Sequence, residues 1–112
     1  MLLIVFFINT GCEYNMPKGL PISCDTTLVT FSGTVKPILS SNCIFCHNTG
    51  NAPLGVNLDN YSATKMQVNN GKLLGSITHS PGFIPMPKGG PKLRDCDISK
   101  IRKWITSGAP NN

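Results

Sequence analysis

The segment Cys43-Ile44-Phe45-Cys46-His47 decides how the rest of the chain is interpreted. Cys-x-x-Cys-His is the attachment motif of c-type haem, in which two thiols form thioethers and the histidine binds the iron. A zinc site needs a second ligand pair at a suitable spacing, and a thioredoxin-like dithiol needs a βαβ unit. The sequence offers neither. We therefore expect one haem c per chain, bound covalently by Cys43 and Cys46, with His47 as the proximal iron ligand.

The chain begins with a short apolar run, residues 2–8, which Asn9-Thr10-Gly11 separates from Cys12. Spanning a bilayer takes about 20 apolar residues, so the run suits the core of a signal peptide instead. Residues 1–11 resemble a lipoprotein signal, with Cys12 as the lipidated residue. No basic residue precedes the run and Asn9 stands where Leu is usual, so an ordinary cleaved signal and an uncleaved segment remain alternatives. We expect an exported, lipid-anchored protein on the periplasmic or cell-surface side of the membrane.

Two further cysteines, Cys24 and Cys96, are left once lipid and haem have been assigned. Leftover cysteines in exported proteins usually pair. We expect a disulfide between them, with two free thiols as the alternative.

Composition indicates one small domain after a tether. The chain has 112 residues, and its 11 Gly and 9 Pro interrupt regular structure. Residues 12–30 contain Pro17, Gly19 and Pro21 and are expected to form the tether, which leaves residues 31–112 as the domain. The formal net charge is +5, from 10 basic and 5 acidic residues. The basic residues are dispersed without interleaved aromatic residues, which argues against nucleic acid as a partner.

Periodicity predicts three to four short helices joined by long loops. A first helix over residues 32–41, capped by Ser32 or Thr34, leads directly into the haem motif. Shorter helices are expected over residues 61–68 and 71–77. The last helix should cover residues 97–107, where apolar residues recur at helical spacing. Residues 48–58 and the proline-rich residues 81–91 are expected to be loops.

This order of elements resembles a small class I cytochrome c. The matching segments are the motif, Ile84-Pro85-Met86-Pro87-Lys88-Gly89-Gly90, and the final helix with Gly108-Ala109-Pro110 after it. The likeness covers about residues 31–110. It implies an all-α cytochrome c fold around one covalently bound haem, with the last helix crossing the first.

Met86 is the expected distal iron ligand, because it lies in a loop that Pro85 and Pro87 stiffen. A thioether opposite an imidazole raises the reduction potential. The plain alternative for a methionine is packing. His79, the only other histidine, is the alternative ligand and would give bis-His ligation; otherwise it is a solvated loop residue.

The haem motif and the expected iron ligands His47 and Met86 predict electron transfer between redox partners such as an oxidase, a reductase or a dehydrogenase. A six-coordinate iron leaves no position for a substrate, so an enzyme is not expected. Two alternatives are a fixed haem relay subunit of a membrane redox complex, and a haem sensor or peroxidase-like protein with a labile sixth ligand.

Several other residues have two interpretations each. The proline-rich residues 81–91 are called the Met86 loop below. The basic residues around this loop either attract a partner with an acidic docking surface or are simply solvated. Aromatic residues belong either to the core or to the haem surroundings. The basic residues are Lys72, Lys88, Lys92 and Arg94, and the aromatic residues are Phe31, Tyr61 and Trp104.

Overall fold

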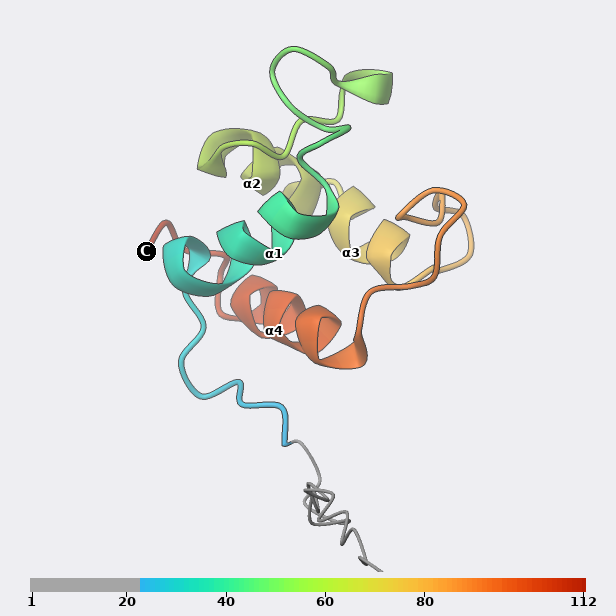
Figure 1. Ribbon diagram of the computed structural model, residues 1–112. Helices are drawn as coiled ribbons and strands as arrows, with labels where there is room; N and C mark the ends of the chain where they lie inside the picture. The colour runs from blue at the N-terminus through green and yellow to red at the C-terminus, as the bar shows by residue number, and fades with distance from the viewer. Residues whose placement is uncertain (1–22) are drawn as a thin grey trace, which may run out of the picture.

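The computed structural model describes residues 23–112, which form a small all-α domain (Figure 1). Its four α-helices are α1 (Lys36–Asn42), α2 (Tyr61–Asn69), α3 (Lys72–Ile77) and α4 (Asp95–Thr106). A π-helical turn, η1 (Phe31–Val35), leads into α1, and a 3-10 turn, η2 (Pro53–Gly55), interrupts the following loop. No strand occurs within residues 23–112. The mostly helical class expected from the sequence is confirmed. Cys12, the signal of residues 1–11 and most of the tether lie outside the described residues.

The first helical segment begins earlier than the sequence predicts, and its cap is Thr30. The Thr30 side chain accepts a hydrogen bond from the amide of Gly33 over 2.9 Å. The expected caps, Ser32 and Thr34, are wrong because both lie inside η1, where the amides of Thr34 and Val35 bond to the Thr30 carbonyl. A Cβ at Gly33 would lie 2.9 Å from the Thr30 hydroxyl oxygen, so a larger residue there would force the capping side chain to shift.

An aromatic cluster joins the start of the domain to α4. The ring centroid of Phe31 lies 5.5 Å from that of Trp104 and 5.3 Å from that of Tyr61. Trp104 is completely buried, and its Nε1–H donates to the Pro110 carbonyl over 2.9 Å. Such pairs stabilise beyond the apolar area that they bury. Phe31 and Trp104 are therefore core residues that hold η1 against α4, and the partly buried Tyr61 of α2 packs against them.

The segment after α4 closes over this cluster. The Tyr61 hydroxyl donates to the Ala109 carbonyl over 2.8 Å. The amide of Phe31 donates to the Asn112 side chain over 2.9 Å, and the amide of Ser32 donates to the Asn112 carbonyl over 2.8 Å. The chain end is thus bonded to both η1 and α2.

Helix α4 places an apolar stripe in the core, with Ile98, Ile101 and Trp104 buried. It begins at Asp95, two residues before the expected start. The acidic residues in its first turn, Asp95 and Asp97, interact favourably with the positive end of the helix dipole. Arg94, just before the helix, donates through Nε to an Asp97 carboxylate oxygen over 3.0 Å.

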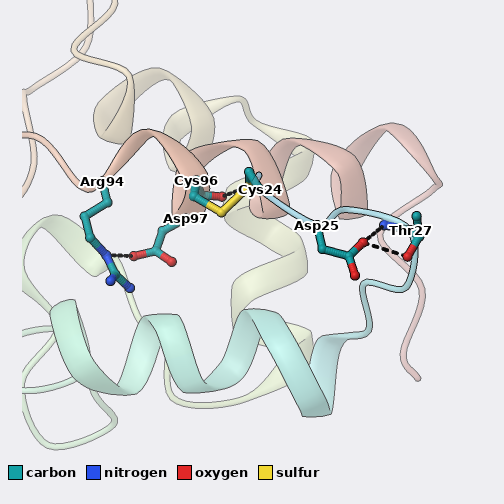
Figure 2. The surroundings of a disulfide bond; sticks show 6 residues. All are labelled: Cys24, Asp25, Thr27, Arg94, Cys96 and Asp97. Carbon is teal, nitrogen blue, oxygen red and sulfur yellow. Dashed lines mark hydrogen bonds and ion pairs between the residues drawn. A yellow bond between two sulfur atoms is a disulfide. The ribbon is translucent and has the colours of Figure 1, made fainter. Parts of the chain in front are cut away.

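A disulfide joins Cys24 to Cys96 in the first turn of α4, with 5.3 Å between the Cα atoms (Figure 2). This separation is within the usual range for a disulfide. The bond fastens the extended segment before η1 to the domain. The tether expected over residues 12–30 is therefore attached to the domain from Cys24 onward.

Within residues 23–112, every helix is too short to cross a bilayer.

Candidate functional site

The Cys43–His47 segment, called the motif below, forms one turn directly after α1. The amides of Cys46 and His47 both donate to the Cys43 carbonyl, over 3.1 Å and 3.0 Å. This turn brings the two thiols and the imidazole onto one short stretch of chain. Both cysteines are free thiols. Cys43 packs against the core, and burial raises the pKa of its thiol to about 11, whereas Cys46 is exposed.

His47 is held in one orientation by the loop that follows it. Its Nδ1 lies 2.9 Å from the main-chain carbonyl oxygen of Val56, and the amide of Leu58 donates to the His47 carbonyl over 3.0 Å. A carbonyl can only accept, so Nδ1 carries the hydrogen. In the neutral ring the lone pair then lies on Nε2, which is the arrangement that a metal-binding histidine requires.

The loop of residues 48–58 is closed at its base, which keeps the Val56 carbonyl in place. The main-chain amide and the hydroxyl of Thr49 both donate to one Asp59 carboxylate oxygen, each over 2.6 Å. These bonds lower the pKa of Asp59 below its ordinary value. The Asn48 side chain also donates to the Ile44 carbonyl over 2.8 Å, which ties the loop back to the motif. Figure 1 shows the loop, in green, projecting from the helices.

Met86 is fixed against the end of α3. Its amide donates to the Ser76 carbonyl over 3.0 Å, and its own carbonyl lies 3.0 Å from Nε2 of His79. The two residues that the sequence offers as distal ligands are thus brought together. His79 directs Nε2 to the main chain of Met86. Figure 1 shows the Met86 loop, in orange, beside α3.

An open hollow of about 470 Å³ lies between the end of α1 and the Met86 loop. Asn42 and Pro87, the chain neighbours of Cys43 and Met86, both line it. Cys43, Cys46, His47 and Met86 themselves are not among its lining residues. The full lining consists of Ser41, Asn42, Pro87, Pro91, Lys92, Leu93, Arg94 and Asp97.

Large apolar side chains stand exposed on the segments that carry the motif and Met86. Phe45 is 94% exposed, Leu54 is 79% exposed and Ile84 is 49% exposed. Phe45 lies between the two motif cysteines, Leu54 in the following loop, and Ile84 two residues before Met86. Each of these segments therefore presents at least one large apolar side chain to solvent.

The basic residues near the Met86 loop differ in their surroundings. Lys72, Lys88, Lys92 and Arg94 are all exposed, and the Arg94 side chain also pairs with the carboxylate of Asp97. All four side chains can therefore present positive charge to a partner.

Within residues 23–112, no group of three or more His, Cys, Asp or Glu side chains forms a set of metal ligands. Haem needs no such group, because the macrocycle holds the iron and the protein supplies only the axial ligands.

Sequence reasoning missed two carbonyl groups that shape the site, those of Val56 and Ser76. Main-chain carbonyls carry no sequence signal, because every residue has one.

Comparisons with models of known families, with curated proteins and with solved structures find no match for this chain. What the site does is therefore inferred from its own residues and geometry.

Proposed function

We propose that this protein carries one covalently attached haem c and passes single electrons between redox partners. The hydrogen bond from Nδ1 of His47 to the Val56 carbonyl carries this proposal. It turns a histidine that directly follows a Cys-x-x-Cys pair into a ligand with a defined tautomer. A histidine that is merely solvated needs no such partner.

The two thiols suit attachment to haem. Each thiol adds across a vinyl double bond, so that sulfur bonds to one carbon and hydrogen goes to the other, and no oxidant is needed. Cys43 and Cys46 are free and lie within one turn of His47. The same two cysteines joined to each other in a disulfide would be unavailable for this addition.

We propose Met86 as the distal ligand. Its loop borders the hollow at Pro87, and its main chain is anchored at the amide and at the carbonyl. Stiff anchoring limits the rearrangement that accompanies electron transfer. His79 is the weaker choice, because its Nε2 is engaged by the Met86 carbonyl.

The arrangement of helices agrees with a cytochrome c fold. The motif directly follows α1, the Met86 loop lies between α3 and α4, and η1 packs against α4 through Phe31 and Trp104. We infer the same fold from this order and these contacts.

The cofactor supplies reversible one-electron chemistry, and the protein supplies position and surroundings. Cys43 and Cys46 would hold the macrocycle, the Val56 carbonyl orients His47, and the exposed apolar side chains would be covered by the bound group. If His47 and Met86 both bound the iron, no position would be left for a substrate. We therefore propose a carrier and not an enzyme.

The proposed partners are redox proteins with an acidic docking surface. The net charge is +5, and Lys72, Lys88 and Lys92 are exposed. Long-range attraction of this kind raises association rates and weakens with salt. The disulfide agrees with an oxidising compartment, and lipidation of Cys12 would attach the protein to a membrane on the exported side.

Spectroscopy of Met86 variants tests the proposal. Oxidised protein should show the weak near-infrared charge-transfer band of Met–haem ligation. Met86→Ala should remove this band, lower the reduction potential and allow carbon monoxide to bind the reduced iron, because water favours ferric iron more than a thioether does. An unchanged spectrum in Met86→Ala, together with loss of six-coordination in His79→Ala, would contradict the assignment of Met86.

A further inference from the structure

His79 and Met86 are joined by a compact set of hydrogen bonds at the end of α3. The Ser76 carbonyl accepts from two amides, that of Met86 over 3.0 Å and that of His79 over 3.2 Å. The His79 ring then reaches the other side of Met86, with 3.0 Å between Nε2 and the Met86 carbonyl oxygen. The main chain of Met86 is thus held on both sides, by the Ser76 carbonyl at its amide and by the His79 ring at its carbonyl.

The direction of the His79 bond follows from its partner. The Met86 carbonyl can only accept, so Nε2 of His79 is the donor. Neutral and charged imidazole can both make this bond, so the contact does not depend on the charge of the ring.

The backbone of His79 is turned to make this contact. Its φ is +54°, in the left-handed region, one residue after the α3 C-cap Thr78. Residues other than glycine seldom adopt this conformation, although histidine is among those that tolerate it. The turn sends the side chain back toward the Met86 loop, where the ring reaches the Met86 carbonyl.

We propose that His79 is a positioning residue for Met86, and that it determines how firmly the Met86 sulfur stays on the iron. This inference rests on the proposed function. A thioether is a soft and readily displaced ligand, so its residence depends on how well the protein holds it in place. Loss of the His79 bond should free the carbonyl side of Met86 and leave only the Ser76 contact.

A pair of substitutions separates the hydrogen bond from the backbone turn. Gln places an N–H donor the same number of bonds from Cα as Nε2 of His79. Asn is one bond shorter and readily adopts positive φ. His79→Asn therefore keeps the turn and loses the contact, whereas His79→Gln can restore the contact. Ser80→Ala serves as the matched control, because it removes the Ser80–Thr78 hydroxyl contact in the same turn without touching Met86.

The test is titration of the oxidised, haem-loaded protein with imidazole, which displaces the distal ligand. His79→Asn should bind imidazole about fivefold more tightly, the size expected for one lost hydrogen bond. The imidazole affinity of His79→Gln should be close to that of the parent, and the affinity of Ser80→Ala should equal that of the parent. The near-infrared band should be weaker in His79→Asn than in the parent, and it should recover in His79→Gln. Exchange of the Met86 amide proton in the reduced protein should quicken in His79→Asn alone.

Each of the following results would overturn the inference. Equal imidazole affinity and equal amide exchange in His79→Asn and the parent would show that His79 does not hold Met86. An equal gain of imidazole affinity in Ser80→Ala would show that any loosening of the turn weakens the hold on Met86. Loss of six-coordination in His79→Asn, with none in Met86→Ala, would make His79 the ligand itself. A parent protein without the Met–haem band would overturn the proposed ligation and this inference together, whereas a band insensitive to His79 overturns this inference alone.

Discussion

The ring of Phe83 lies directly over Gly75. A Cβ added at Gly75 would come within 2.5 Å of the Phe83 Cγ and Cδ2 atoms. Gly75 is in α3, and Phe83 is in the loop that leads to Met86. The missing side chain of this glycine therefore allows the loop to pack closely on the helix.

Gly75→Ala should destabilise the protein and displace Phe83. The clash involves ring atoms next to the Phe83 Cβ, so rotation of the side chain cannot relieve it cheaply. Overpacking of this kind costs about 1–3 kcal/mol, more than the gain in helix propensity on replacing glycine. Urea unfolding of the two proteins measures the difference.

The control for this prediction is Phe83→Ala. In the Phe83→Ala background, Gly75→Ala should be neutral or stabilising, because its Cβ then meets no ring. An equal cost in both backgrounds would show that the close approach of Phe83 to Gly75 is not the cause.

Removing the disulfide should lower stability more than any surface change. The bond between Cys24 and Cys96 spans a sequence separation of 72 residues. The chain-entropy account assigns a loop of this length about 4 kcal/mol. Cys24→Ser combined with Cys96→Ser should shift the denaturation midpoint accordingly, and the parent protein under reducing conditions should match it. If the reduced parent unfolds at the same denaturant concentration as the oxidised parent, the bond does not contribute as expected.

The two motif thiols should react at very different rates in protein prepared without haem. Alkylation follows the thiolate, and burial raises the pKa of Cys43 from 9.0 to about 11. At pH 8 the thiolate fraction of Cys43 should be about 100-fold below that of an unperturbed thiol. Peptide mapping after iodoacetamide treatment should find Cys46 modified first. In urea both should react together, whereas rapid labelling of Cys43 in the folded protein would contradict its burial.

Cys12→Ala should release the protein from membranes, because lipid is the only strong anchor that the sequence suggests. Fractionation of cells that express the parent and the variant measures the change. Ser23→Ala, near the disulfide but outside the lipid signal, is a suitable control. Retention of the Cys12→Ala protein in the membrane fraction would point to an uncleaved segment instead.

Helix positions were predictable from the sequence, because the periodic apolar residues of α4 and the polar cap of α2 are local signals. Asn60 caps α2, since its side chain accepts from the Ala63 amide over 2.9 Å. The start of η1 was not predictable. The cap of this π-helical turn is Thr30, and the turn packs on α4 through Phe31 and Trp104, which are far apart in the sequence.

The contacts that orient the site could not be predicted from the sequence. The bond from His47 to the Val56 carbonyl joins residues nine apart through an irregular loop, and the bond from His79 to the Met86 carbonyl requires a positive φ at a histidine. Both acceptors are main-chain groups, and their positions depend on the folded loop. The motif indicates the chemistry, and only the folded loop indicates how the ligands are held.

The most direct test of the central claim is the mass and haem stain of the denatured protein, purified after expression with a haem-attachment system. The account predicts a mass increase of one haem per chain and haem-linked peroxidase activity that survives denaturing electrophoresis. Cys43→Ala combined with Cys46→Ala should lose both, because no thioether can form. A parent chain that carries no covalent haem, or a double variant that still stains, would contradict the account.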